Sequence, residues 1–306
     1  MVSYILRRIV MLIPVLFGVT LVSFSLLHLV PGDPAEVLGG QEASKADIDR
    51  IRKEYGLDQP LVAQYARFIG NAVRGDLGIS IQSRHPVREL LLQRLAFTLQ
   101  LALASVLVAA ALGLLAGIIS STRQYSFFDT ASMLGALFGI SMPIFWLGLL
   151  LILVFAANLQ WLPSGGTGSI RHLILPAIAL GSASAAVIAR MTRASMLEVT
   201  RQDYIRTARA TGYRERVIIF RHALKNAMIP VLTVFGLEFG SMLGGAVLTE
   251  TVFSLPGIGR LLVEGIFARD YPVVQGAMIL VASTFVLVNL LTDVAYAFFD
   301  PRIRYE

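Results

Sequence analysis

The sequence has no cysteine and few charged residues. Of its 306 residues, 56% are apolar and only 15% are charged, and the mean hydropathy is +0.70. The lack of cysteine excludes disulfide bonds and thiolate metal sites. Uncharged runs of about twenty residues cannot be hidden in the core of a soluble domain of this size. The composition therefore predicts an all-α, polytopic membrane protein.

The groups that most enzymes use are also scarce. The sequence has three lysines, and none completes the Gly-x4-Gly-Lys-Ser/Thr loop that holds nucleotide phosphates. Its four histidines show no metal-ligand spacing: they are His28, His85, His172 and His222. We therefore expect a non-enzymatic protein that needs no cofactor, with a membrane hydrolase as an alternative. His28 is an interfacial residue or, as an alternative, part of a proton relay.

Six apolar segments predict six transmembrane helices in one transmembrane domain covering residues 1–306. The expected spans are residues 9–30, 95–119, 131–157, 173–189, 228–248 and 273–299. The segment between the last two, residues 250–271, contains Pro256-Gly257-Ile258-Gly259 and is expected to be a turn-rich loop. Arg7 and Arg8 precede the first segment, as in a signal peptide. Its apolar run is longer than the roughly 7–15 residues of a signal core, so we expect a retained span.

Three of the spans have features that predict their packing. Pro143 lacks a backbone N–H, so it predicts a kink near residues 139–143, and such kinks often line a pathway through the membrane. The span 173–189 is rich in small residues, which let helix backbones approach closely, so we expect it to lie centrally. The fifth span repeats this feature with Gly236, Gly240 and Gly244.

Polar residues inside the spans are candidates for a path. Glu238 lies near the middle of the fifth span, where an ionisable group costs about 2.5–3.5 kcal/mol. It is expected to face the path or a partner subunit, or to be a protonated carboxyl hydrogen-bonded between helices. Asn289 and Asp293 share a face of the sixth span, which indicates a polar path, a bond between helices or a pairing with basic residues.

A polar excursion, residues 31–94, separates the first two spans. Ser44 begins a predicted helix that stops near Gly56, and Pro60 begins another that stops near Gly75. The second helix has an apolar face that packs on the spans or receives a partner: Leu61, Tyr65, Phe68, Ala72 and Val73.

A basic arm, residues 190–227, joins the fourth and fifth spans. It holds nine basic and three acidic residues, which accounts for the whole net charge of +6. The excess is therefore local and indicates topology rather than nucleic-acid binding. We expect a helix broken at Gly212 and a second helix over residues 215–226. Such an arm is more typical of a docking surface than of a simple connector.

The arm also resembles a known family. The run 203–212, followed by His222, Asn226 and Pro230, is similar to the cytoplasmic signature loop of binding-protein-dependent ABC importer permeases of the peptide/nickel branch. The resemblance extends to residues 31–34, 75–80, 253–260 and 300–304. The general Glu-Ala-Ala of this loop is Arg206-Thr207-Ala208 here, and the usual Lys before Gly212 is Thr211.

The resemblance implies a permease subunit that pairs with a second permease, two cytoplasmic ATPases and an extracytoplasmic binding protein in the bacterial inner membrane. It places the ATPase contact on Arg206, Thr207, Ala208, Arg209, Ala210, Thr211, Gly212 and Tyr213. With the positive-inside rule it places both termini in the cytoplasm and residues 31–94 outside.

Small peptides are the expected substrates, with glutathione or nickel chelates as alternatives. The loop 158–172 is short where some dipeptide permeases have a long insertion, which argues against a tight match to those permeases and makes a glutathione-type or other short-loop relative a comparable expectation. A stand-alone secondary transporter is a further alternative. It would need inverted repeats and broken half-helices with coupling-ion ligands, which the sequence does not show.

Overall fold

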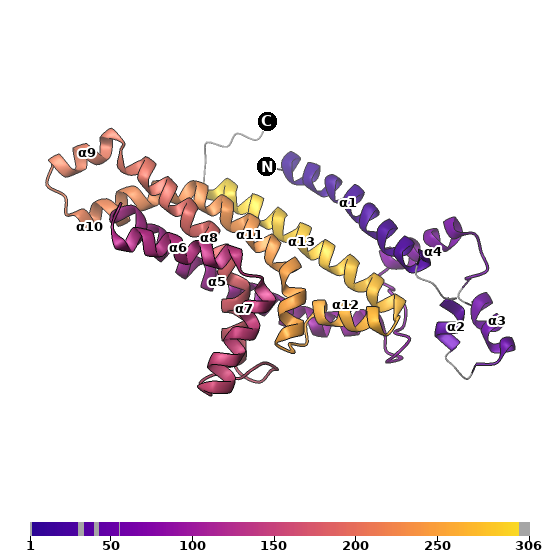
Figure 1. The fold of residues 1–306 in the computed structure, drawn as a ribbon. Coiled ribbons are helices and arrows are strands. Elements are labelled where there is room, and N and C mark those ends of the chain that lie inside the picture. Colours follow the sequence, from indigo (N-terminus) through magenta and orange to yellow (C-terminus); the bar gives the residue numbers. More distant parts are fainter. Residues whose placement is uncertain (1, 30–33, 40–42, 55, 300–306) are drawn as a thin grey trace. The chain divides into compact units, whose positions relative to one another are not determined.

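The computed structural model describes residues 2–29, 34–39, 43–54 and 56–299 (Figure 1). Within these ranges the chain is helical and forms no β-strand, which confirms the all-α class. The helices of the first third are α1 (Val2–Leu29), α2 (Pro34–Gly39), α3 (Lys45–Glu54), α4 (Leu61–Val73) and α5 (Val87–Thr122). The middle contains α6 (Phe127–Ser141), α7 (Ile144–Leu151), the π-helix η1 (Ile152–Asn158), α8 (Arg171–Thr200), α9 (Asp203–Ala210) and α10 (Glu215–Val217). The π-helix η2 (Ile218–Ala223), α11 (Leu224–Val252), α12 (Ile258–Phe267) and α13 (Tyr271–Phe299) complete the chain.

The helices fall into two compact units. The first contains Met1–Ala96 and Gly257–Thr284, and the second contains Phe97–Pro256 and Phe285–Glu306. The boundaries fall inside α5 and α13, so each of these helices contributes to both units.

In the first unit, α4 packs against α1 through aromatic rings. Tyr65 makes edge contacts with Phe17 and Phe24, and Phe68 stacks on Phe24. The hydroxyls of Tyr65 and Thr20 lie 2.9 Å apart. Of the apolar face expected on this helix, Tyr65 and Phe68 therefore pack within the chain, whereas Leu61 and Val73 are exposed.

The predicted helix starts in the polar excursion are confirmed. The Ser44 hydroxyl accepts the backbone N–H of Asp47 and donates to its carboxylate, and this hydrogen bond keeps the pKa of Asp47 below its ordinary value. The next helix follows Pro60, whose missing N–H costs nothing at a helix start.

The expectation of a turn-rich loop over residues 250–271 is wrong, because α12 occupies much of it. Ile258 and Leu261 of this helix are buried in a cluster with Val87 and Leu91 of α5 and Val273 of α13. The apolar residues of Ile258–Phe267 supply a buried face, and the Pro-Gly pair lies before the helix, where it does not interrupt it. Helix α5 likewise begins at Val87, eight residues before the expected span.

A buried carboxylate holds the loop after α4 in the same unit. Asp270, 2% exposed, accepts the Ser80 hydroxyl at 2.5 Å and the backbone N–H groups of Ile81 and Gln82 at 3.1 and 3.2 Å. These three hydrogen bonds attach the loop after α4 to the start of α13. They also give the buried carboxylate the donors that a buried polar group needs.

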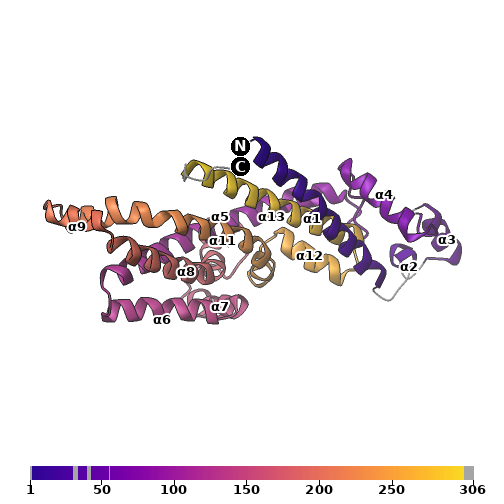
Figure 2. The same cartoon turned by 90° about the horizontal axis from the view of Figure 1, so that it is seen from above.

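In the second unit, α8 is the central helix (Figures 1 and 2). It contacts α6, α7 and α11. In α8, 61% of the most apolar 18-residue window is buried. The corresponding share is 28% in α5, 33% in the helix over Glu215–Val252 and 28% in α13. The small-residue argument for a central fourth span is confirmed, although the helix continues well beyond residue 189, to Thr200.

The third span is broken at Pro143. Met142 and Pro143 have extended backbone conformations, and the helices on either side are bent by 108°. A residue before proline avoids the helical region and proline donates no N–H, so both residues favour the break. The kink predicted here is confirmed, and at 108° it makes the segment a bent pair of helices; that residues 131–157 form one span stays a prediction.

Four described helices are long and apolar enough to cross a membrane, and the bent pair makes a fifth if it is counted as one span. The apolar part of α1 within this search, Ile13–Ser25, is shorter. Six spans and a single domain therefore stay predictions. The motif residues 31–33 and 300–304, and the side chains of Arg7, Arg8, His28 and Asp293, lie outside the described part of the chain.

The glycine row of α11 leads to a test of close packing. A Cβ at Gly236 would overlap the Thr292 side chain of α13, whereas a Cβ at Gly244 would meet nothing within 4 Å. We predict that Gly236→Ala lowers the thermal stability of the purified protein. Gly244→Ala is the matched control, and it should be neutral or slightly stabilising because alanine favours a helix by about 0.5–1 kcal/mol. Equal melting temperatures for the two variants, measured by size-exclusion after heating, would contradict this packing.

Candidate coupling arm and polar sites between helices

The arm is built around α9, a two-turn helix seated on a small apolar cluster. Ile205 and Ala208 of α9 are buried against Met196 at the end of α8 and against Ile218 and Ala223 of η2. Burying an isoleucine completely contributes about 1.5–3 kcal/mol. The cluster therefore attaches α9 to both helices that lead out of the arm.

Most of the predicted contact residues lie on the outer side of this helix. The structure buries Ala208 and exposes Arg206, Thr207, Arg209, Ala210, Thr211, Gly212 and Tyr213. Arg209 reaches across the break to Glu215 at 2.9 Å, and Arg206 lies 3.5 Å from Asp203. These pairs are solvent-exposed, so each adds at most about 1 kcal/mol.

Gly212 ends the helix as predicted. Its φ is +83°, in the left-handed region that glycine adopts without a Cβ penalty, and a Cβ there would meet nothing within 4 Å. The outer surface is therefore open at this residue.

The second half of the arm differs from the expectation. A separate helix over residues 215–226 was expected. Instead, α10, η2 and α11 form one uninterrupted helix from Glu215 to Val252. The π-turn at η2 fits one extra residue into the helix, which allows it to continue through the expected boundary. Tyr213 packs edge-on against His222, and Asn226 donates to the Tyr204 hydroxyl at 2.8 Å.

Glu238 lies between helices, half-buried on α11. Its carboxylate accepts the hydroxyl of Ser184 on α8 at 2.5 Å. This contact agrees with the alternative of a carboxyl hydrogen-bonded between helices.

The three path candidates are not brought together. Asn289 of α13 lies against Gly240, two residues from Glu238, and residues two apart do not share a helix face. Pro143 is exposed at the break of the third span, where the following residue Ile144 reaches Gly245 of α11.

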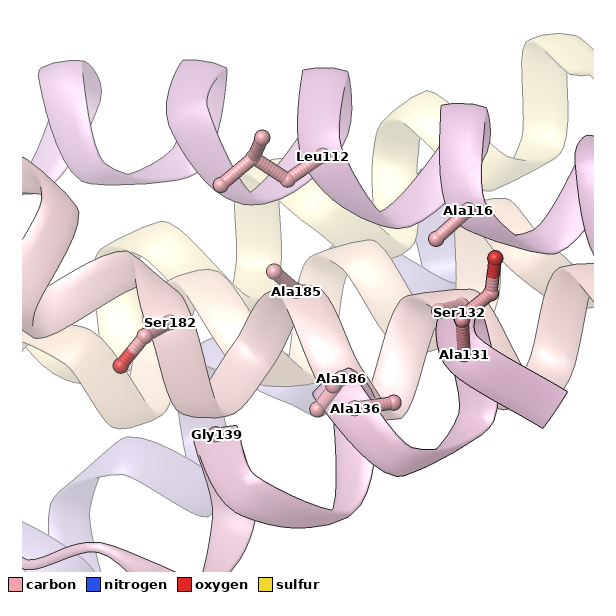
Figure 3. Close-up of a pocket in the computed structure, with 11 residues that line it drawn as sticks. Leu112, Ala116, Ala131, Ser132, Ala136, Gly139, Ser182, Ala185 and Ala186 are labelled. Atoms are coloured by element: carbon pink, nitrogen blue, oxygen red, sulfur yellow. The ribbon is translucent and has the colours of Figure 1, made fainter. Parts of the chain in front are cut away.

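A groove of about 320 Å³ lies between α5, α6 and α8 (Figure 3). Small side chains leave it open, and Ser132 and Ser182 are its only polar side chains. None of Pro143, Glu238 and Asn289 lines it.

The structure adds an ion pair that spacing along the sequence did not predict. Asp129 at the start of α6 is 6% exposed and receives Nε and Nη2 of Arg193 on α8 at 2.9 and 3.0 Å. The hydroxyl of Ser120 and the backbone N–H of Tyr125 also donate to it. The sequence did show Asp129 as the single acidic residue in the short link before the third span. It could not show that Arg193, 64 residues away, would be its partner.

A second polar contact, also missed, joins α5 to α11. Glu250 is fully buried and accepts the hydroxyl of Thr98 at 2.6 Å. Glu250 lies two residues past the expected fifth span, 228–248, so it was assigned to the loop that follows.

Comparison with known proteins agrees with this architecture. Residues 89–305 match the family described as binding-protein-dependent transport system inner membrane component, and residues 1–102 match the N-terminal part of such membrane components. The chain belongs to this family. It is a multi-pass ABC transporter permease of the peptide/nickel branch.

Curated relatives match this permease from end to end. It is 47% identical to the dipeptide transport system permease DppB of Alkalihalophilus pseudofirmus over 333 aligned residues and to the di/tripeptide permease DppB of Pseudomonas aeruginosa over 335. It is also 47% identical to the glutathione transport system permease GsiC of Escherichia coli K12 over 306. Each alignment covers all of both chains.

Solved structures share the fold. The inward-facing MetNI methionine ABC transporter matches with a TM-score of 0.59 and 19% identity, covering 69% of this permease and 96% of that chain. An amino acid ABC transporter matches with a TM-score of 0.52 and 17% identity, covering 70% and 94%.

The Ser184 contact of Glu238 predicts how this permease responds to substitution. Glu238→Gln should leave assembly and melting temperature almost unchanged, because the amide oxygen still accepts the Ser184 hydroxyl. Glu238→Leu should lower the melting temperature, since it leaves a hydroxyl donor without this acceptor at a cost of about 1–3 kcal/mol. A Gln variant that assembles normally but changes the pH dependence of uptake would instead assign Glu238 to the path.

Proposed function

We propose that this permease is the transmembrane subunit of an ATP-driven importer that moves small peptides into the cytoplasm. ATP is hydrolysed on two separate cytoplasmic subunits, a second permease completes the membrane part, and an extracytoplasmic binding protein delivers the substrate. The end-to-end likeness to dipeptide and glutathione permeases carries the proposal. It is supported by a sequence without a phosphate-binding loop and with an arm whose outer surface is free for a partner.

Within this class we favour small peptides that include glutathione, itself a tripeptide. The alignment with the glutathione permease spans 306 positions, which is the length of this chain. The alignments with the two DppB permeases span 333 and 335 positions and therefore contain insertions. The short loop 158–172 agrees with the glutathione-type length.

The test is uptake by the complete transporter. The permease would be co-expressed with a second permease and two ATPases from the same organism and reconstituted with a binding protein. We expect ATP-dependent uptake of labelled dipeptide or glutathione. Uptake by this chain alone, without ATP, would instead support a secondary transporter. A complete transporter that takes up neither solute would contradict the proposed substrate class.

We further propose that both termini and the arm are cytoplasmic, in the bacterial inner membrane, and that the polar excursion, residues 31–94, is outside. The nine basic residues of the arm support this orientation.

The absence of cysteine makes the orientation directly testable. Ser83 is exposed, so Ser83→Cys should react with an impermeant maleimide added outside the cell. Ala210→Cys in the arm is the matched control, and it should react only once the cytoplasmic side is opened. The reverse labelling pattern would invert the topology.

For coupling, we propose that an ATPase subunit docks on residues 207–213. Gly212→Asp probes this contact with little internal disturbance, because aspartate tolerates a left-handed φ better than most residues and the position has room for a Cβ. We predict normal insertion and pairing with the second permease, but loss of substrate-stimulated ATP hydrolysis and of uptake.

The control adds the same charge at the other end of α9. Gln202 is exposed and precedes the helix, where aspartate is a favourable cap, so Gln202→Asp should retain both activities. Normal uptake by Gly212→Asp, or loss of ATPase co-purification in both variants alike, would remove this residue from the proposed contact.

A further inference from the structure

The Asp129–Arg193 ion pair lies on a continuous line of contacts that starts at the arm. Ile205 and Ala208 of α9 pack on Met196 of α8. Arg193 precedes Met196 by three residues, so both side chains lie on neighbouring parts of one helix surface. A displacement of α9 is therefore applied to the turn of α8 that carries Arg193.

The pair then joins α8 to α6 by directional bonds. Both guanidinium bonds are short and parallel, and such bidentate pairs resist rotation and sliding more than a single contact does. Ser120 of α5 and the backbone of Tyr125 hold the carboxylate from the other side.

Elsewhere α6 and α8 touch through small residues. Ala136 packs on Ala186 and Ala189, and a Cβ at Gly139 would lie 2.9 Å from the carbonyl oxygen of Ser182. These smooth surfaces permit one helix to slide along the other. Among the described residues, Arg193 and Asp129 form the only ion pair between the two helices.

The far end of α6 is the break at Met142 and Pro143. Backbone hydrogen bonding stops on either side of the break: Met142 donates to Phe138, and the next helix starts with Trp146 donating to Pro143, which itself has no N–H to donate. Among the described residues, no backbone hydrogen bond therefore fixes the angle between α6 and α7. The two helices around the break can therefore respond to a push on α6.

We propose that Asp129 and Arg193 are positioning residues that make α6 move together with α8, so that motion of the coupling arm reaches the break at Pro143. The proposal rests on the proposed function, since the arm moves only when ATPase subunits drive it. The test therefore measures motion near the break.

The reporter is a fluorophore on α6. Phe138 is exposed on the last turn of this helix, and Phe138→Cys gives a single thiol for an environment-sensitive dye. In the transporter assembled with its ATPases, we expect a non-hydrolysable ATP analogue to change the emission. Arg193→Gln and Asp129→Asn should each remove most of this change, because neither amide can form the bidentate pair. Arg190→Gln, which removes a charge one turn earlier on the same helix, should retain it.

A double variant separates positioning from stability. Asp129→Asn with Arg193→Gln leaves no unpaired buried charge, so it should recover the melting temperature that either single change lowers. We expect it still to lack the emission change, because two neutral amides do not reproduce the bidentate pair. Recovery of the emission change along with stability would show that the pair is only structural and would overturn the proposal. So would single variants that respond normally, or an unmodified transporter that does not respond.

Failure of the proposed function gives a different result. It would appear as a lack of ATPase co-purification, or as a transporter that takes up neither peptide nor glutathione, whereas the reporter needs ATPase binding and no substrate. An emission change that survives in every variant would leave uptake intact and overturn only the role of Asp129 and Arg193.

Discussion

The packing of the second unit depends on close approach of backbones to α8. Lipid satisfies apolar side chains as well as another helix does, so helices in a membrane gain little from burying large apolar residues. They gain from short distances: a Cβ at Gly181 would lie 2.6 Å from the Ser105 carbonyl oxygen of α5, and one at Gly113 of α5 would lie 2.7 Å from the Ala185 carbonyl oxygen. Small residues on α8 are the reason that α5, α6 and α11 can surround it.

Contacts between small residues fix how far apart two helices lie better than they fix how the helices are aligned along their lengths. Polar pairs between helices fix that alignment. Asp129 with Arg193, Glu238 with Ser184 and Glu250 with Thr98 each join two helices of this unit. Each carboxylate accepts a hydroxyl or guanidinium, because an unpaired one would be very costly away from water. Such bonds hold only at one alignment of the two helices, and they therefore define the register.

Features that depend on residues near each other in the sequence were predictable, whereas features that depend on contacts between distant residues were not. The small residues of 173–189 and the proline at 143 act on neighbouring backbone, so the central helix and the kink were predictable. Asp129 and Arg193 were not predictable as a pair, since only the fold brings residues 64 apart together. Helix α12 was missed because Pro256 and Gly257 suggested a turn, while its helical stability comes from burial against distant segments. The continuous helix through η2 was missed because a π-turn has no distinct residue pattern.

The outer and inner faces of α9 are held by interactions of different strength. The ion pairs of Arg206 and Arg209 are exposed and contribute at most about 1 kcal/mol each, so a partner can replace them at little cost. Ile205 is fully buried and contributes more than either pair. A partner that binds the outer face can therefore rearrange the charges of α9 without detaching the helix. Because the buried residue contacts both α8 and η2, any force on α9 is carried into two helices at once.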